Sequence, residues 1–141
     1  MNVAKLDPRA ILPRRIHSYD AGYDLFARED ATLQPGDMPT PMRTGIALCI
    51  PSGHVGIIKP RSSLGVQGIQ VYGGVIDSGY RGEVIVLLGS VQCGQTFRIK
   101  AGARIAQLVV ARIYTEDILE VSSELLGVTD RGVGGFGSTG R

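Results

Sequence analysis

The apolar residues of this chain come in short runs that end at glycine or proline. Three of these runs span residues 46–50, 55–58 and 84–88, and proline or glycine follows each within two residues. Runs this short, separated by turn residues, are typical of β-strands rather than helices. The 141-residue chain also contains 20 glycines, which suits many tight turns and close backbone approaches. The pattern predicts an all-β domain of sandwich, jelly-roll or barrel type.

A helical period is hard to find anywhere in the sequence. The best candidates are residues 62–67, which Gly65 interrupts, and residues 116–126, which carry Val121 and paired serines. Neither sustains three turns of an amphipathic pattern, so at most one short helix is expected. Residues 105–113 have the β-branched content and length of a strand that is buried on both faces, and we interpret them as a strand, although the pattern alone also fits a helix.

The composition changes near the C-terminus. Residues 1–126 hold nearly all of the apolar side chains, and we expect them to form one domain. Residues 127–141 are rich in glycine and leave almost nothing to bury except Phe136. Such a segment cannot hold itself in place, so we expect a mobile tail until a ligand orders it.

The charge balance argues against a surface that binds a charged polymer. Fifteen basic and thirteen acidic residues give a formal net charge of +2. Nucleic-acid binding is therefore not expected, and a bound anion should be small and held locally. Charged residues interrupt the first sixteen positions, so neither a signal peptide nor a membrane segment is expected. These features favour a soluble intracellular, cytoplasmic protein and leave a nuclear or viral origin open.

The two cysteines do not form a recognisable metal or redox motif. Cys49 and Cys93 lie 44 residues apart, and His17 and His54 are the only histidines. No CxxC pattern is present, so neither a disulfide framework nor a zinc site is indicated. We expect reduced, buried thiols.

Residues 60–65, with the sequence PRSSLG, are the first segment with candidate chemistry. A proline stop is followed by a fixed cation, Arg61, and by two hydroxyls, Ser62 and Ser63, at the start of a possible short helix. Free backbone amides and the positive end of a helix dipole suit such a place to phosphate. The alternative is structural: a serine caps the turn and Arg61 pairs with a surface carboxylate.

Residues 73–84, with the sequence GGVIDSGYRGEV, are the second segment with candidate chemistry. The pattern predicts a hairpin whose bend carries a carboxylate, Asp77, and an aromatic ring, Tyr80. Two glycines before it would let a flat ligand approach the backbone, so that Asp77 could act as a general base and Tyr80 as a stacking wall. The alternative is a turn-forming aspartate beside a half-buried tyrosine.

Residues 131–140, with the sequence RGVGGFGSTG, are the third segment with candidate chemistry. Successive glycines allow backbone amides to curl around a polyphosphate, and Phe136 could cover a base. The segment lacks the ending of a Walker loop, so a P-loop fold is not implied. A flexible terminus without a ligand is the alternative.

Five segments in order resemble the motifs of the trimeric deoxyuridine triphosphatase (dUTPase) family. They read AGYDL, PRSSLG, GGVIDSGYRGEV, GARIAQL and RGVGGFGSTG, and they span residues 21–140. The resemblance implies a jelly-roll-like subunit and a homotrimer with three shared active sites. It also implies hydrolysis of dUTP to dUMP and pyrophosphate, which keeps uracil out of DNA and supplies dUMP for thymidylate synthesis.

The resemblance also assigns roles to individual residues. Asp77 would activate the water that attacks the α-phosphate, and Tyr80 would pack on the deoxyribose. The remaining substrate contacts that the family implies are main-chain groups around Gly74 and Ile85 for uracil, Arg61, Ser62, Ser63 and Gln107 for the α and β phosphates, and Arg131, Phe136, Gly137, Ser138 and Thr139 in a tail that closes a neighbouring subunit's site. One Mg²⁺ would be held mostly by triphosphate oxygens and waters, with Asp24 orienting such a water or a neighbouring group.

The sequence departs from the family pattern at three positions. Gly79 and Ala103 stand where an acidic residue is common, and Val133 is unusual in the last motif. These changes leave the inferred catalytic residues in place but put local stability and tail conformation in question.

Two other functions share parts of the pattern. The dCTP deaminase group resembles this fold and also has an Arg-Ser-Ser segment, but Asp77, Tyr80 and the glycine-rich tail argue against it. A non-catalytic jelly-roll protein with an assembly or regulatory role would be expected to lack Asp77 or Phe136, and both are present.

Overall fold

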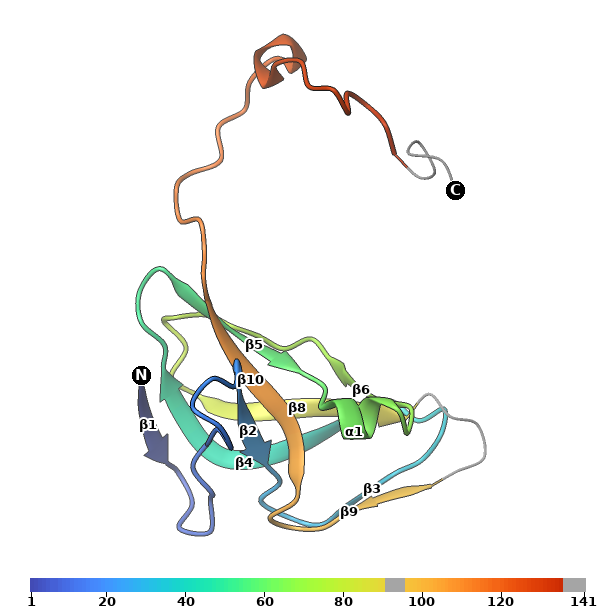
Figure 1. Cartoon of the computed structure of the whole chain (residues 1–141). Coiled ribbons are helices and arrows are strands. Elements are labelled where there is room, and N and C mark those ends of the chain that lie inside the picture. Colours follow the sequence, from blue (N-terminus) through green and yellow to red (C-terminus); the bar gives the residue numbers. More distant parts are fainter. Residues whose placement is uncertain (91–95, 136–141) are drawn as a thin grey trace.

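The computed structural model (Figure 1) describes residues 1–90 and 96–135. Within these ranges nearly all of the regular secondary structure is β-strand. The elements are β1 (Asn2–Lys5), β2 (Gly22–Phe26), β3 (Ala31–Leu33), β4 (Thr40–Cys49), β5 (His54–Lys59), α1 (Ser62–Gly65), β6 (Ile69–Tyr72), β7 (Val75–Ile76), β8 (Glu83–Ser90), β9 (Phe97–Ile99), β10 (Arg104–Arg112) and the 3₁₀ turn η1 (Ser123–Leu126). The all-β prediction is confirmed.

Two four-stranded antiparallel sheets make up the body of the molecule. One has the strand order β1-β4-β8-β6 and the other β2-β10-β5-β7, while β3 and β9 form a small separate ribbon. Buried side chains from both large sheets belong to one hydrophobic cluster, which includes Met42 and Val86 from the first sheet and Leu25 and Leu108 from the second. This two-sheet arrangement is consistent with the jelly-roll-like subunit that the sequence predicts.

The predicted strands are found, with longer boundaries than the apolar runs suggested. The runs at 46–50, 55–58 and 84–88 lie in β4, β5 and β8, and β10 is a central strand between β2 and β5. Burial of β10 on both faces holds only for its first half, since residues 109–111 are partly exposed. Its second half approaches the end of the sheet, where less structure covers it.

One predicted pairing is wrong. Residues 73–84 do not form a hairpin, because β7 pairs with β5 in one sheet while β8 pairs with β4 and β6 in the other. The pattern of a strand, a turn and a second strand is correct, but the turn crosses between sheets. Turn residues in a sequence do not reveal which strand becomes the neighbour, and this crossing shapes the site described below.

The helical content is as small as expected. Residues 62–67 contain the single turn α1, whereas in residues 116–126 only the short η1 is helical. Within the two described ranges, no helix is long and apolar enough to cross a membrane.

The chain leaves the body of the molecule after β10 (Figure 1). Residues 113–133 are all exposed, including Ile118 at 98%, Leu125 at 73% and Leu126 at 75%. Apolar side chains of this size are rarely left in water without a partner. The separation of a tail at residue 127 remains a prediction, because the extended segment already begins at residue 113.

The prediction that both cysteines are buried thiols is wrong for Cys49. Cys49 is a free thiol, but it is only partly buried at the end of β4, where the edge strand β1 covers it incompletely. Cys93 lies outside the described residues.

Candidate active site

The chain switches between the two sheets at Gly73 and Gly74. Both glycines have positive φ, at 64° and 99°, a backbone conformation that side chains disfavour. β6 therefore stops pairing with β8 after the Tyr72–Leu87 pair, and β7 turns away to pair with β5. The part of β8 from Glu83 to Val86 consequently has no strand on that side in the described chain. Backbone groups on this side of β8 therefore have no partner strand, although the Glu83 carbonyl accepts a hydrogen bond from the Tyr80 hydroxyl.

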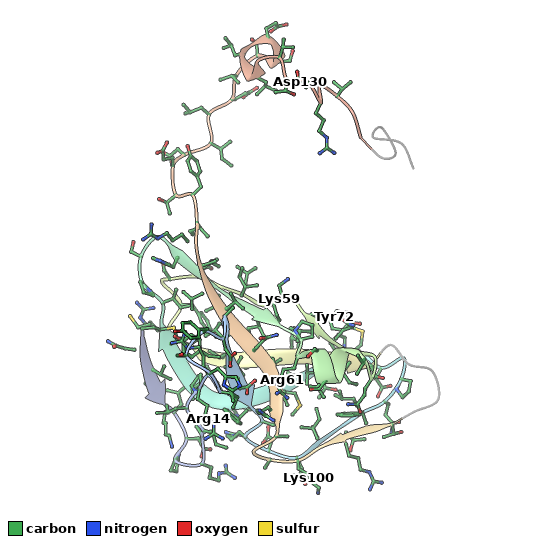
Figure 2. The ribbon with its side chains drawn as sticks, viewed as in Figure 1. Arg14, Lys59, Arg61, Tyr72, Lys100 and Asp130 are labelled. Carbon is green, nitrogen blue, oxygen red and sulfur yellow. The ribbon has the colours of Figure 1, made fainter. Side chains whose placement is uncertain are left out.

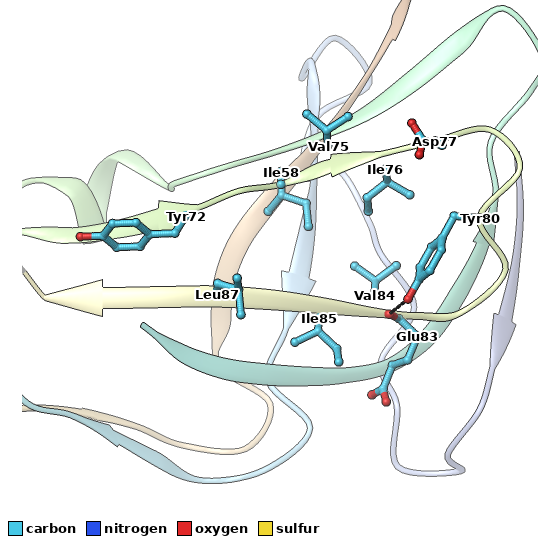
Figure 3. Close-up of a pocket in the computed structure, with 11 residues that line it drawn as sticks. Ile58, Tyr72, Val75, Ile76, Asp77, Tyr80, Glu83, Val84, Ile85 and Leu87 are labelled. Atoms are coloured by element: carbon cyan, nitrogen blue, oxygen red, sulfur yellow. Dashed lines mark hydrogen bonds between the residues drawn. The ribbon is translucent and has the colours of Figure 1, made fainter. Parts of the chain in front are cut away.

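A pocket of about 200 Å³ lies between β7 and β8, where the two strands diverge (Figure 3). We call it the β7–β8 pocket. Its walls include Gly74, Asp77, Tyr80 and Ile85, so the structure brings together four of the residues that the sequence assigns to one site. Most other lining side chains are apolar, and Tyr72 lies at the opposite end from Tyr80 (Figure 3).

The turn after β7 is held by a backbone hydrogen bond and by the Arg81 side chain rather than by the Asp77 side chain. The Tyr80 amide donates to the Asp77 carbonyl at 3.1 Å, and the Arg81 guanidinium donates to the carbonyls of Ser78 and Tyr80 at 2.7 and 2.8 Å. Asp77 is exposed, and no hydrogen bond to its carboxylate occurs in the described chain. The carboxylate is therefore free to accept a proton or orient a water.

The Tyr80 ring has a defined position over its own loop. Its hydroxyl donates to the Glu83 carbonyl at 3.0 Å (Figure 3), and the ring remains 46% exposed. A Cβ added at Gly82 would lie only 2.3 Å from the Tyr80 hydroxyl oxygen. Glycine at position 82 is what allows the ring to fold back, with one face free for a ligand.

A second, polar pocket of about 270 Å³ lies around Arg61. We call it the Arg61 pocket. It is lined by Asp24, Ser62 and Gln107 together with Arg61, all of them residues that the sequence singled out. The Ser62 and Ser63 amides belong to the first turn of α1, which offers them no helical acceptor. Cation and amide donors at one place suit the pocket to a small anion.

Asp24 fixes the Arg61 side chain. One carboxylate oxygen accepts from Arg61 Nε at 2.9 Å, and the other accepts from Arg104 Nη1 at 3.3 Å. Asp24 is 8% exposed on the central part of β2, so its charge needs these partners. Arg61 does pair with a carboxylate, as the structural alternative supposed, but that carboxylate is buried. No serine side chain caps α1, so the capping alternative is wrong.

Gln107 reaches the same pocket from β10. Its amide Nε2 donates to the Pro60 carbonyl at 3.0 Å, directly before Arg61. A Cβ at Gly22 would lie 2.3 Å from the Gln107 amide oxygen, so glycine at position 22 makes room for this side chain. The paired positions Asp24 and Gln107 thus present their side chains from neighbouring strands.

The remaining predicted site residues are not brought to either pocket within the described chain. Ser63 lines neither pocket, although its hydroxyl lies 3.5 Å from Arg61 Nη1. Arg131 donates to the Gly134 carbonyl at 3.1 Å on the extended C-terminal segment, where its neighbour Asp130 is far from Arg61 and Tyr72 (Figure 2). Phe136, Gly137, Ser138 and Thr139 lie outside the described residues.

Comparison with known proteins decides the family. A family model described as dUTPase matches residues 8–140. A deoxyuridine 5'-triphosphate nucleotidohydrolase of Mycobacterium leprae is 44% identical over 98% of this chain and 93% of its own length. One from Rabbitpox virus is 45% identical over 94% of this chain and 87% of its own length. This chain belongs to the dUTPase family.

Solved dUTPase structures share the fold. A Staphylococcus bacteriophage 80alpha dUTPase variant with dUpNHpp superimposes with a TM-score of 0.91 at 30% identity, covering 99% of this chain and 98% of the phage chain. A dUTPase variant from phage phi11 of S. aureus, whose structure concerns a structural Mg(II) ion, has a TM-score of 0.80 at 28% identity over 86% of this chain and 96% of its own. The suspected family membership is confirmed.

Three residues at or near the pockets were not singled out by the sequence. Arg104 was overlooked although it lies inside GARIAQL, and a signal for it existed: Asp24 is an acid on a strand of apolar neighbours and requires a cation. Arg81 and Tyr72 carried no such signal. Their roles depend on a turn and a pocket that exist only in the folded chain.

The three departures from the dUTPase pattern do not disturb the packing of the described chain. A Cβ at Gly79 would contact nothing within 4 Å, and Val133 is fully exposed. The Ala103 backbone is hydrogen-bonded to Lys100 and Ala27 through its amide and carbonyl. None of the three changes leaves a gap in the core of the described chain.

Proposed function

We propose that this chain hydrolyses dUTP to dUMP and pyrophosphate, by attack of an Asp77-activated water on the α-phosphate. The observation that carries the proposal is the β7–β8 pocket, in which Gly74, Asp77, Tyr80 and Ile85 meet. Membership of the dUTPase family supports the same reaction. In the cell the reaction would keep uracil out of DNA and supply dUMP for thymidylate synthesis.

Uracil would bind in the β7–β8 pocket through backbone groups. The unpaired side of β8 presents N–H and C=O groups near Ile85, and a flat base edge pairs with them much as a neighbouring strand would. Cytosine carries a donor at the position where uracil carries an acceptor, so it would leave buried polar groups unpaired. To select uracil, the pocket would also have to exclude the thymine methyl group, as the resemblance to dUTPases implies.

The sugar would lie against Tyr80 and the reacting phosphate beside Asp77. The ring packs on the deoxyribose and leaves no room for a 2′-hydroxyl. Asp77, three residues before Tyr80 on the same turn, orients a water and accepts its proton as the water attacks phosphorus. Because phosphoryl transfer depends on positioning and charge neutralisation, no covalent intermediate with the protein is required.

The triphosphate would be held by the Arg61 pocket. Arg61, Ser62 and Gln107 offer a cation, a hydroxyl and an amide, and Asp24 fixes the cation in place. Ser63 lies outside the pocket but beside Arg61, and we propose that its hydroxyl also binds the phosphates. The α and β phosphates would lie here. Arg131, Ser138 and Thr139 of the tail would bind the γ end, while Phe136 stacks over uracil and Gly137 lets the backbone approach.

Magnesium would be bound mainly through the substrate. In residues 1–90 and 96–135 no three acidic, histidine or cysteine side chains come together, and both Asp24 oxygens already accept from arginines. This donor set fits an ion that keeps its waters and binds triphosphate oxygens, with Asp24 in contact only through water. When bound, Mg²⁺ would neutralise charge on the phosphates that the attacking water approaches.

A homotrimer would unite the two pockets. The β7–β8 pocket and the Arg61 pocket share no lining residue, so one chain offers a site for the nucleoside and a separate site for the phosphates. Outward apolar side chains on β8 and the exposed apolar residues of the C-terminal segment supply surface for such contacts. In the assembled trimer each active site would combine pockets from two chains and the tail of a neighbour.

Pyrophosphate release tests the proposal directly. The assay compares dUTP, dTTP, UTP and dCTP, each with Mg²⁺ and with a chelator. We expect rapid release from dUTP with Mg²⁺ and slow release in every other case. The dCTP sample is also assayed for ammonia, because substantial ammonia would favour the deaminase alternative. Equal release from all four nucleotides would contradict selection in the β7–β8 pocket.

A further inference from the structure

β4 contains an irregularity opposite the start of β8. Arg43 pairs with Ile85 and Ala47 pairs with Glu83, so the three β4 residues 44–46 lie opposite the single residue Val84 of β8. Gly45, in the middle of the bulge, has a φ of 71°. The regular ladder is interrupted here, and the Gly45 amide has no backbone acceptor on β8.

The Glu83 side chain replaces the missing strand contacts. Its Oε1 accepts from the Gly45 amide at 2.8 Å, and its Oε2 accepts from Arg43 Nε at 2.9 Å and also from Nη2. The neighbouring Thr44 hydroxyl, itself buried, donates to the Val84 carbonyl. Although burial alone would raise the pKa of Glu83, the hydrogen bonds from Arg43 and Gly45 keep it below its ordinary value. The first two residues of β8 are thus both bonded to the bulge, Glu83 through its side chain and Val84 through its carbonyl.

The same residue carries the acceptor that positions Tyr80. The Glu83 side chain points away from the pocket, whereas the Glu83 carbonyl receives the Tyr80 hydroxyl (Figure 3). Gly82 has no side chain beneath the ring, and the hydroxyl is bonded to this carbonyl, so we expect a shift of the carbonyl to move the ring. Ile85, which also lines the pocket, is two residues further along the same strand.

We propose that Glu83 is a positioning residue for substrate selection: by tying the start of β8 to the β4 bulge, it sets the Tyr80 ring against the sugar. The inference rests on the proposed dUTP hydrolysis for its kinetic consequence. Its structural content, that the Glu83 carboxylate determines the place of the Tyr80 ring, is independent of the reaction.

The kinetic test compares selectivity between dUTP and UTP in matched variants. In Glu83→Ala both contacts to the bulge are lost, and we expect the ratio of kcat/KM for dUTP to that for UTP to fall about tenfold, since small misplacements of positioning groups are costly. Glu83→Gln keeps an acceptor for the Gly45 amide but loses the charge opposite Arg43, so a smaller fall is expected. Lys100→Ala removes the exposed Lys100–Asp30 ion pair elsewhere and should leave the ratio unchanged.

A second readout follows the ring itself. The chain has five tyrosines, so ¹³C labelling of tyrosine rings gives few signals, and Tyr80→Phe identifies the one from Tyr80. We expect this signal to shift in Glu83→Ala and to stay in place in Lys100→Ala. Because Tyr80→Phe already removes the hydroxyl, adding Glu83→Ala to it should cost little further selectivity.

These readouts separate the two proposals. Failure of the wild-type protein to hydrolyse dUTP would overturn the proposed function, while the ring signal would still decide the positioning role. An unshifted Tyr80 signal in Glu83→Ala, or a lower melting temperature with an unchanged selectivity ratio, would reduce Glu83 to a structural residue and overturn the inference. If Glu83→Ala does not fold, Glu83→Gln provides both measurements.

Discussion

Asp24 binds Arg61 through Nε, at 2.9 Å, and so leaves the outer nitrogens of the guanidinium directed to other partners. Arg104 donates to the second carboxylate oxygen at 3.3 Å. One buried acid therefore holds two cations, and the cluster keeps a net positive charge beside Ser62 and Gln107. The proposed phosphate site depends on this arrangement rather than on the single turn of α1.

Replacing Asp24 tests the arrangement. Asp24→Asn leaves two arginines without their counterion, and since both are partly solvated we expect a loss of about 1–3 kcal/mol in the free energy of unfolding. KM for dUTP should rise more than kcat falls, because Arg61 loses its fixed orientation. Urea unfolding and steady-state kinetics measure both effects. Asp30→Asn, which breaks the exposed pair with Lys100, is the control and should alter neither. Equal behaviour of the two variants would refute the role of Asp24.

The Asp77 carboxylate is expected to matter for turnover but not for binding. Asp77→Asn keeps the shape of the turn and removes the proton acceptor, so kcat should fall by about 10²–10⁴-fold with nucleotide affinity retained. Calorimetric titration with a non-hydrolysable dUTP analogue gives the affinity, and pyrophosphate release gives the rate. Asp37→Asn changes an exposed acid outside both pockets as the control. Near-normal turnover in Asp77→Asn would remove Asp77 from its assigned role.

The sequence predicts local structure well because local signals carry it. The apolar runs around residues 46–50 and 84–88 end at proline or glycine, and they are strands in the fold. The five motifs predict the family, and the two pockets contain residues from four of these motifs. Each of these features depends on a few adjacent residues, so it can be recognised in a single sequence.

Long-range pairing could not be predicted in the same way. The turn at residues 77–82 has the composition of a hairpin, yet the positive φ at Gly74 sends β7 to a different sheet from β8. The contact between Glu83 and the Gly45 amide joins residues 38 positions apart and depends on a bulge with no distinctive sequence mark. Whether Phe136 covers a base depends on a neighbouring chain, which one sequence does not contain.

Shortening the chain after Val128 tests the role of the tail. Residues 129–133 are exposed and contribute nothing to the buried core, so the truncated protein should fold and keep its assembly state. We expect kcat/KM for dUTP to fall at least about a hundredfold, because several phosphate and base contacts would be lost together. Light scattering after gel filtration and steady-state kinetics measure these outcomes. Unchanged activity would contradict a tail that closes the site.

Acid stability should depend on Asp7. Hydrogen bonds from the Arg9 side chain, then from the Arg9 amide, lower the pKa of Asp7 from 3.8 to about 2. The folded state thus binds this proton less readily than the unfolded state, so the contribution to stability is complete above pH 3.8 and is lost as the pH falls towards about 2. Urea unfolding of Asp7→Asn should show a deficit near neutral pH that shrinks through this window. A deficit of constant size would show that Asp7 does not act through its charge.

Because the two pockets are separate on one chain, mixing two variants tests whether a site is shared between subunits. Asp77→Asn disables the β7–β8 pocket, and Arg61→Ala disables the Arg61 pocket. Each variant alone should be nearly inactive. In a cyclic trimer that shares sites between neighbours, every mixed trimer contains one site in which both pockets are intact.

The most direct measurement is therefore dUTP hydrolysis after the two inactive variants are unfolded together in equal amounts and refolded. Sites shared between subunits should restore about one quarter of the wild-type rate, because three quarters of randomly assembled trimers are mixed and each has one intact site in three. Activity that stays at the level of the separate variants would contradict sites shared between subunits.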